Sequence, residues 1–247
     1  MIMNELKLIV DGKRLDGRRP EDMRPIVARA GILKKAGGSG YFSFGSTSAI
    51  AGVYGPNPVY PRFKEEQEKA ILRVIYSMAP FSTTTRVRPG ISRRGTEISL
   101  VIKKAFESVL FLEEFPKTMI EIYVEILEAN ASTRCAAINA VSLALADAGI
   151  PMRDLIASCS VGKIDGQIAI DIAGKEDENG EVDIPVAYYP RKDFVTLLQM
   201  DGIMSKEDFK KAVAMAIDGC KKIHAEQKNA LRSKYTEMDL NDVTAGL

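Results

Sequence analysis

The feature that most constrains this chain is a strand, a turn and a helix in direct succession. Apolar side chains alternate through residues 120–127, the period-two pattern of a half-buried strand. An alanine-rich segment, 135–148, follows the turn 129–134 and ends before Gly149 and Pro151, which are typical helix terminators. The first N–H groups of a helix have no partner within it and carry the positive end of its dipole. The turn is therefore a candidate anion site.

Three side chains of this turn suit either of two roles. Ser132 or Thr133 can cap the helix, and Arg134 can hold phosphate oxygens through two N–H groups. Because serine and threonine cap many helices, the local pattern alone favours an ordinary cap followed by a surface arginine. The anion site therefore depends on support from elsewhere in the chain.

The inventory of side chains narrows the chemistry of any active site. The 247 residues include one histidine, His224, which we expect on the surface without a catalytic role. Hydrolytic triads and most zinc sites use histidine, so neither class is favoured. The cysteines Cys135, Cys159 and Cys220 are too scattered for a zinc or disulfide framework, and we expect them to be buried. Arginine, lysine and carboxylates remain, which are the side chains that handle phosphate groups.

A second candidate site is a local concentration of arginine. The net charge of the whole chain is only +1, yet residues 82–96 contain four arginines and no acidic residue. Arg93 and Arg94 stand just before a predicted helix, 96–112, where each can contact a different phosphate of a nucleic acid. Taken alone, the pattern favours a solvated basic surface. Two helix starts that bear arginine in one chain favour a shared site.

The third candidate is the acidic segment 175–183, in which Asp177 and Asp183 flank a turn at Asn179 and Gly180. A carboxyl group beside bound phosphate can protonate a departing sugar oxygen or bind a divalent ion. An acidic hairpin exposed to solvent is the alternative, and composition does not exclude it.

The remaining pattern predicts one α+β unit. We expect short strands in 37–55, a helix in 65–78, and strands 157–163 and 167–172 joined by a hairpin turn at Asp165 and Gly166. Further strands are expected at 185–189 and 194–200, before a long final helix capped by Ser205. The longest uncharged apolar-rich stretch, 135–146, is too short to cross a membrane, and the start of the chain does not resemble a signal peptide. We therefore expect a cytoplasmic protein that does not bind membranes.

Four motifs in this order and spacing resemble the RNase PH family, and within it the catalytic ring subunits of archaeal exosomes. They are RLDGRRP at 14–20, SRR at 92–94, LALADAGIPMRD at 143–154 and LLQMDG at 197–202. The resemblance covers nearly the whole chain. It implies an α+β fold of two related ββαβα halves, of the kind called ribosomal protein S5 domain 2-like. On this basis residues 1–247 form a single RNase PH-like domain, with an N-terminal arm at 1–20 and a C-terminal helix at about 205–234.

The resemblance also implies an activity, substrates and partners. In such proteins inorganic phosphate attacks the 3′-terminal phosphodiester of RNA and releases a nucleoside diphosphate, and the reverse reaction adds tails from diphosphates. The active subunit alternates with an inactive paralogue, three copies of each, in a hexameric ring that threads RNA and carries RNA-binding cap proteins. Inorganic phosphate is thus the co-substrate, and magnesium or manganese is the expected ion.

The resemblance assigns roles residue by residue. The roles are phosphate binding by Ser132, Thr133 and Arg134, RNA binding by Arg93, Arg94 and Arg62, and catalysis by Arg134, Asp177 and Asp183. Asp177 matches the proposed general acid, and Asp183 is the second acidic residue and, with Asp177, a metal ligand. One departure concerns the turn, which reads NASTR where many relatives have glycine. Ala131 and Ser132 are less free than glycine to present backbone N–H groups.

Two other functions are compatible with these motifs. A homohexameric RNase PH that trims tRNA 3′ ends would use the same chemistry in a different assembly. A non-catalytic RNA-binding ring subunit is the second alternative, and the presence of both Arg134 and Asp177 speaks against it.

Overall fold

The computed structural model describes residues 7–245, with side chains as far as residue 236. A first sheet has the strand order β3 (Ile26–Ala30), β4 (Gly38–Phe44), β5 (Thr47–Pro58), β7 (Thr118–Glu128) and β6 (Ile71–Met78). Neighbouring strands are antiparallel except β6 and β7, which are parallel. Helix α1 (Arg93–Glu107) lies in the crossover that a parallel pair requires.

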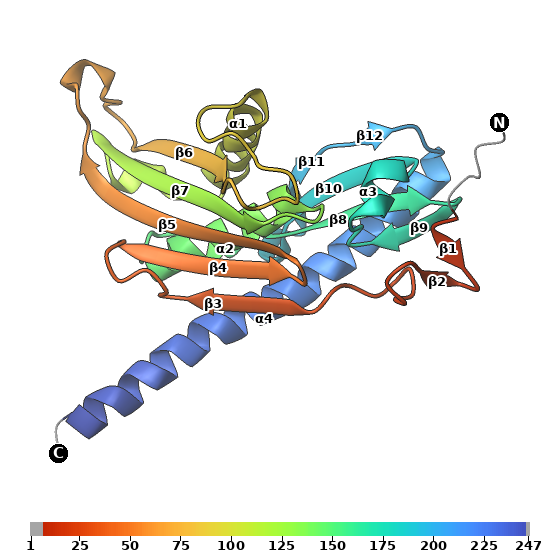
Figure 1. Cartoon of the computed structure of the whole chain (residues 1–247). Coiled ribbons are helices and arrows are strands. Elements are labelled where there is room, and N and C mark those ends of the chain that lie inside the picture. Colours follow the sequence, from red (N-terminus) through yellow and green to blue (C-terminus); the bar gives the residue numbers. More distant parts are fainter. Residues whose placement is uncertain (1–6, 246–247) are drawn as a thin grey trace.

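A second sheet has the order β11 (Phe194–Leu198), β10 (Val182–Tyr189), β8 (Ala157–Ile164) and β9 (Gln167–Ile170), with β12 (Asp201–Gly202) paired to β10. The predicted hairpin is confirmed, because β8 and β9 are joined at Asp165 and Gly166, both with positive φ. A short helix, α3 (Lys175–Asn179), connects β9 to β10. The N-terminal arm forms a small hairpin of β1 (Ile9–Val10) and β2 (Lys13–Arg14), which lies at the end of the molecule formed by the second sheet (Figure 1).

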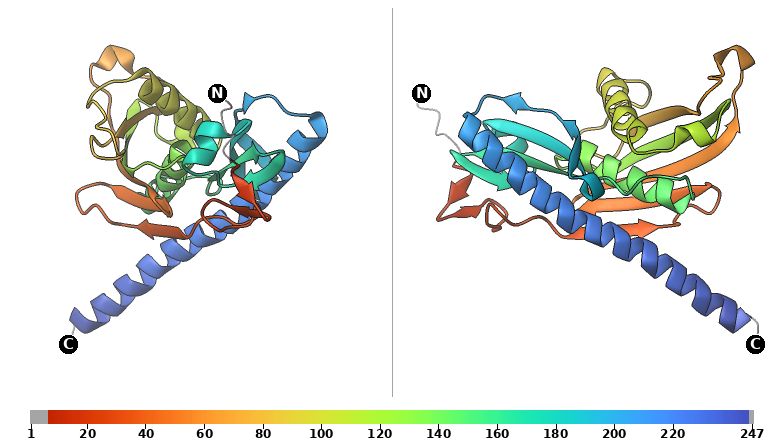
Figure 2. Two further views of the ribbon diagram at one scale, coloured as in Figure 1. Left: turned by 45° about the vertical axis from the view of Figure 1, so that its right-hand side comes forward. Right: turned by 180° about the vertical axis from the view of Figure 1, so that it is seen from behind.

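The two halves follow the same order of elements, which confirms the expected α+β fold. The first half contains β4, β5, α1, β7 and α2 (Thr133–Asp147), with β3 and β6 added. The second contains β8, β9, α3, β10 and α4 (Lys206–Ala245), with β11 and β12 added. Figure 2 shows α4 running across both halves on one side of the molecule. The expected single domain over 1–247 stays a prediction, and residues 1–6 of the expected arm lie outside the described residues.

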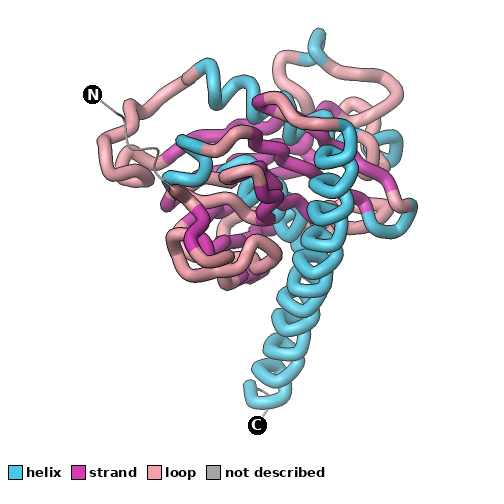
Figure 3. Tube along the Cα trace, turned by 90° about the vertical axis from the view of Figure 1, so that its right-hand side faces the viewer, coloured by secondary structure: helices cyan, strands magenta, loops and turns pink. Residues whose placement is uncertain are grey.

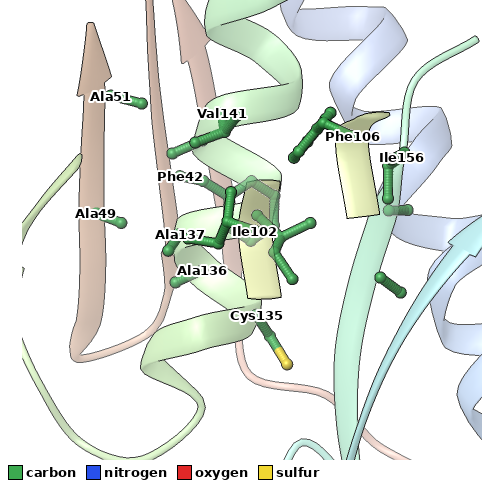
Figure 4. Packing of buried hydrophobic residues seen from close by; sticks show 14 of the residues in the cluster. Phe42, Ala49, Ala51, Ile102, Phe106, Cys135, Ala136, Ala137, Val141 and Ile156 are labelled. Atoms are coloured by element: carbon green, nitrogen blue, oxygen red, sulfur yellow. The ribbon is translucent and has the colours of Figure 1, made fainter. Parts of the chain in front are cut away.

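Helix α2 is the centre of the core. Every residue from Cys135 to Leu145 is buried, so the helix is covered on all sides and not along one stripe only. Figure 4 shows Ala136, Ala137 and Val141 of this helix between strands of the first sheet and the segment at Ile156. The alanine-rich composition follows from this position, since small side chains let both sheets approach the helix closely. The fold thereby fixes the N-terminal end of α2, which bears the predicted anion site.

The tightest approach to α2 is at Gly40 of β4. A Cβ atom at this position would lie 2.3 Å from the carbonyl oxygen of Ala140 and 2.7 Å from Cβ of Leu143. We expect Gly40→Ala to lower the free energy of unfolding by about 1–3 kcal/mol, because backbone must move to relieve the overlap. Urea unfolding followed by circular dichroism measures this loss. The matched control is Gly37→Ala, whose nearest atom lies at 3.3 Å, and an equal loss in the two variants would contradict the argument.

The helix predicted for 65–78 is wrong, because this segment contains strand β6. The spacing of Ala70, Ile71, Val74 and Met78 fits a helix, but Leu72, Val74 and Tyr76 are the buried set, which is an alternating pattern. The segment pairs in parallel with β7 over its whole length. Pairing with a strand some fifty residues later in the sequence therefore outweighs the local helical periodicity and makes this segment a strand.

The final helix is longer than predicted. Ser205 caps it as expected, accepting a hydrogen bond from the backbone N–H of Asp208 at 3.1 Å. The helix then continues to Ala245, beyond the expected end near Lys234, and extends past the rest of the chain in Figure 3. None of the helices in residues 7–245 combines the length and apolar character needed to span a membrane.

The histidine and the cysteines are all buried. His224 is only 8% exposed, and its Nε2 lies 3.2 Å from Oδ1 of Asp154, so the expected surface position is wrong. The carboxylate of Asp154, in the connection between α2 and β8, supplies the polar partner that burial of an imidazole requires. Cys135, Cys159 and Cys220 are buried and free, as predicted.

Candidate active site

A cavity of about 420 Å³ lies where helices α1 and α2 begin. The segment from α3 into β10 forms the opposite wall. Figure 1 shows α3 and β10 to the right of α1, in the second half of the molecule. Six of the eight predicted site residues line the cavity, namely Arg94, Ser132, Thr133, Arg134, Asp177 and Asp183. The three candidate sites identified along the sequence therefore form one site.

The turn that opens α2 has an uncommon backbone for a segment without glycine. Ala131 (φ 60°) and Ser132 (φ 55°) both adopt the left-handed conformation, which costs about 1 kcal/mol or more for each such residue. Hydrogen bonds from outside hold the turn in this shape. The Thr47 hydroxyl donates to the carbonyl of Ala131 at 2.9 Å, and Arg24 Nη1 donates to the carbonyl of Asn130 at 2.8 Å. The neighbouring structure thus enforces a backbone that glycine would adopt freely.

The expected side-chain cap of α2 is wrong. Ser132 occupies the cap position, but its hydroxyl donates to the carbonyl of Ile172 at 3.0 Å and lies 2.7 Å from Oγ of Ser160. The left-handed turn thus places this hydroxyl against the second sheet and not over the helix end. Residues 132–135 all line the cavity. The N-terminus of α2 has no side-chain cap among the described residues and meets the cavity with the positive end of its dipole.

Two arginines add positive charge to this wall of the cavity. Nη2 of Arg94, at the start of α1, lies 3.4 Å from Oγ1 of the buried Thr133. Arg134 Nη1 donates to Oε1 of Gln199 and lies 3.5 Å from Oε1 of Glu97. Gln199 in turn donates to Glu97 at 3.1 Å. Arg134 is therefore held in place at the cavity wall before any ligand binds.

The two carboxyl groups of the opposite wall differ in burial and in pKa. Asp177 is exposed, and partial removal from water raises its pKa, while the positive charges of Arg94 and Arg134 act in the opposite direction. Asp183 is less exposed, and burial followed by the negative charge of Asp177 raises its pKa to about 6. Oδ1 of Asp183 is buried and accepts no hydrogen bond from the described residues. The site therefore contains two carboxyl groups that hold protons more tightly than ordinary aspartates.

The acidic segment is not the predicted hairpin. Residues Lys175–Asn179 form α3, and Asp183 already belongs to β10, where it pairs with Gly162 of β8 and Asp201 of β12. The helix begins after Gly174, and its one buried residue is Glu176. Asp177 therefore projects from a short helix, whereas Asp183 is fixed in a sheet.

Comparison with known proteins agrees with this geometry. Residues 22–151 match the 3′ exoribonuclease family (RNase_PH), domain 1, and residues 154–219 match its domain 2. The chain belongs to the RNase PH family. It is 52% identical over 234 residues to the exosome complex component Rrp41 of Pyrococcus furiosus, covering 94% of each chain. It is 50% identical over 225 residues to the component of the same name from Methanopyrus kandleri, covering 91% of this chain and 94% of that protein. The structure of rice Rrp46 superposes with a TM-score of 0.80 at 25% identity, covering 89% of this chain and all of that one.

Two residues predicted from the RNase PH resemblance lie outside the cavity. Arg93 is exposed at the first position of α1, next to Arg94 but not in the cavity wall. Arg62 is exposed in a short 3₁₀ helix, Arg62–Lys64, within the connection between β5 and β6. The cavity therefore supports the roles of the other six predicted site residues, but it gives no support to RNA binding by Arg93 and Arg62.

Three residues at this site were not predicted from the sequence. Gln199 and Glu97 hold Arg134, and Tyr76 of β6 is only 5% exposed next to Thr133 and Arg94, where burial raises the pKa of its hydroxyl. Gln199 lies in the LLQMDG motif, which was the one available signal for it. Tyr76 lay in a segment predicted as a helix, and Glu97 carries a charge opposite to the one expected beside bound RNA.

Proposed function

We propose that this chain degrades RNA from its 3′ end by phosphorolysis, as the catalytic subunit of an archaeal exosome. The observation that carries the proposal is the convergence of Arg94, the start of α2 at Thr133 and Arg134, and the carboxyl groups of Asp177 and Asp183 in one cavity. The named relatives are exosome components, and the family is one of 3′ exoribonucleases. A binding module would need the arginines but not the two carboxyl groups with raised pKa.

Inorganic phosphate binds at the N-terminus of α2 in this proposal. The uncapped N–H groups of the helix and the Thr133 hydroxyl donate to its oxygens, and Arg134 contacts it through the guanidinium group. Glu97 and Gln199 fix the direction of that group, so little side-chain entropy is lost when phosphate arrives. Arg94 Nη2 lies 3.4 Å from Oγ1 of Thr133, so this guanidinium group can stabilise the negative charge that the two phosphates bring together.

The reaction exchanges one P–O bond for another. An oxygen of the bound phosphate forms a bond to the phosphorus of the terminal nucleotide, and the bond from that phosphorus to the preceding O3′ breaks. The products are a nucleoside diphosphate and an RNA that is one nucleotide shorter. The departing O3′ requires a proton, which Asp177 supplies as a carboxyl group of the cavity wall whose pKa is raised by its partial removal from water. In reverse the same groups add nucleotides from diphosphates to a 3′ end.

Magnesium or manganese fits the two carboxylates of the site. Among the side chains described, no group of three or more His, Cys, Asp or Glu could hold an ion. Mg²⁺, however, commonly binds through one or two carboxylates together with substrate phosphates. The buried Oδ1 of Asp183, which has no partner in the described chain, is available for this purpose. Asp183 would hold the ion, joined by Asp177 only as the carboxylate that remains once its proton has passed to O3′, and the ion would supply positive charge to the phosphate oxygens.

The assembly in this proposal is a hexameric ring that alternates this chain with an inactive paralogue, three copies of each, and carries RNA-binding cap proteins. Large apolar side chains that are strongly exposed in this chain support a covered surface, among them Phe81 (74%), Ile91 (fully exposed) and Ile203 (91%). Arg93 and Arg62 contact RNA outside the cavity. The cytoplasmic location stays a prediction.

The proposal is tested by supplying polyadenylate with and without inorganic phosphate. We expect release of adenosine diphosphate that depends on phosphate, and Arg134→Ala should lower it about 10²- to 10³-fold, the usual loss when one donor to a developing charge is removed. Arg232→Ala, an exposed arginine of α4, is the matched control and should retain the wild-type rate. Release of adenosine monophosphate without phosphate would refute phosphorolysis.

The same preparation separates the alternative assemblies. Purified alone, the chain should have low activity that rises when the paralogue is added, whereas a homohexameric RNase PH would be fully active on its own. Native mass measurement of both preparations distinguishes an alternating ring from a ring of identical subunits.

A further inference from the structure

Two arginines of the N-terminal region are buried, Arg14 against the second half of the chain and Arg24 between the two halves. Arg14 is 3% exposed and Arg24 is 6% exposed, although both come from a motif-rich segment that lies far from the cavity residues in sequence. Burial of a guanidinium group is unfavourable unless every donor finds an acceptor. The partners of these two side chains therefore indicate what the segment holds in place.

All five N–H groups of Arg14 have acceptors. Nε donates to Oε1 of Glu176 at 2.8 Å, and Nη2 donates to Oε2 of Glu176 and to the carbonyl of Asp171 at 2.8 Å. Nη1 donates to the carbonyl of Ile170 at 2.6 Å and to that of Asp22 at 3.4 Å. One side chain thus joins the end of β9, the loop after it and helix α3.

Helix α3 cannot maintain its shape alone. It has five residues, far fewer than the roughly 12–15 that an isolated helix needs in water, and its cap residue Gly174 has no side chain to offer. Glu176 is its one buried residue, 3% exposed, and besides Arg14 it accepts the backbone N–H of Ala173 at 2.9 Å. The ion pair with Arg14 is therefore the main contact that orients α3 on the sheet.

Asp177 is the next residue along this helix. Its Cα position and the direction of its side chain follow from the position of Glu176, because the two share a single helical turn. We infer that Arg14, acting through Glu176, is a positioning residue that sets Asp177 at the reacting phosphate. This inference rests on the proposed function, since it assigns Asp177 the proton transfer.

Arg24 keeps the segment that follows the arm attached to both halves when Arg14 is altered. Its Nη2 and Nε donate to Oδ1 and Oδ2 of the buried Asp171 at 2.6 and 2.8 Å, and its Nη1 donates to the carbonyl of Asn130. A variant of Arg14 therefore loosens α3 while the turn that starts α2 stays fixed. The expected change is in the maximal rate, with little change in the affinity for phosphate.

The test compares Arg14→Lys and Glu176→Gln with the wild type in the assembled complex. Lysine keeps the charge but has three donors at one point, which cannot reach all the acceptors arranged around the edge of a guanidinium plane. Glutamine keeps the shape of Glu176 and removes its charge. In both variants we expect kcat to fall about ten- to hundredfold and the KM for phosphate to stay within about threefold. If Arg14→Lys does not fold, the kcat and the KM for phosphate of Glu176→Gln test the inference.

The matched control is Asp147→Asn, which breaks another buried ion pair at the far end of α2. Asp147 is 3% exposed in its side chain and accepts from Lys234 and from the backbone N–H of Ser39. It should lower the melting temperature without changing kcat. A loss of kcat in Arg14→Lys no greater than in this control, or a change in KM equal to the change in kcat, overturns the inference.

Failure of the inference and failure of the proposed function give different results. A wild-type complex that releases no diphosphate refutes the proposed function. An active wild type that is inactivated by Asp177→Ala but not by Arg14→Lys or Glu176→Gln refutes only the role of Arg14. If the inference is correct, adding Arg14→Lys to Asp177→Ala causes no further loss of the residual rate, because Arg14 acts only through the side chain already removed.

Discussion

Replacement of Asp177 by alanine is expected to abolish phosphorolysis while RNA remains bound. The departing O3′ would leave as an alkoxide without a proton donor, and loss of a general acid typically slows a reaction 10²- to 10⁴-fold. We expect a fall of about a thousandfold in diphosphate release. Affinity for RNA should change less than about threefold, because Asp177 carries no positive charge and the arginines of the site remain.

Two further variants define the cause of that loss. Asp177→Asn keeps the size of the side chain and should be as inactive as alanine, because an amide is not a useful acid. Glu226→Ala removes an exposed carboxylate of α4 that lies outside the cavity and should keep the wild-type rate within about threefold. Diphosphate release and fluorescence anisotropy of labelled RNA measure the two effects. Diphosphate release by Asp177→Ala at the wild-type rate would show that another group protonates O3′.

Local sequence signals were sufficient for most elements that surround the site. Strand β7, helix α2 and the hairpin of β8 and β9 follow from alternation, alanine content and turn residues, each within a few positions of the observed bounds. The helix predicted for 65–78 is wrong because the apolar residues of β6 fit both a helix and a strand, and the partner strand β7 that decides between them follows α1 in the chain. Pairing of that kind has no local signal.

The candidate site shows the same difference between residues that have a local sequence signal and contacts that join distant segments. Arginine beside a helix start and carboxylates near a turn make Arg94, Arg134 and Asp177 candidates, and the family resemblance assigns their roles. The contacts that orient them span much longer separations, such as Gln199 to Arg134 and Arg14 to Glu176. The sequence motifs that contain Gln199 and Arg14 supported the family resemblance, but their physical roles depend on which strands become neighbours. Composition also missed the left-handed turn at Ala131 and Ser132, because hydrogen bonds from distant residues enforce it.

Asp183→Asn is expected to stabilise the protein while it removes activity. The pKa of Asp183 is raised to about 6 in the folded protein, above its ordinary value of 3.8, by burial and by the charge of Asp177. Above pH 6 the group is charged in both the folded and the unfolded chain, and the folded state bears the full cost of that charge. As the pH falls through 6 the folded protein takes up a proton and the cost declines, until it disappears below pH 3.8. The stabilising effect of asparagine should therefore be about 2–3 kcal/mol at pH 8 and close to zero near pH 4.

Urea unfolding of the two proteins at pH 8, 6 and 4, in the presence of a chelator, measures this difference. Glu226→Gln is the matched control, because Glu226 is an exposed carboxylate of α4 outside the cavity, and its effect should stay within about 0.5 kcal/mol at each pH. A gain that is equal at pH 8 and pH 4 would mean that packing, and not the buried charge, is responsible. A gain confined to high pH, together with loss of diphosphate release, would show that the carboxylate is kept at a cost in stability for what it does in the site.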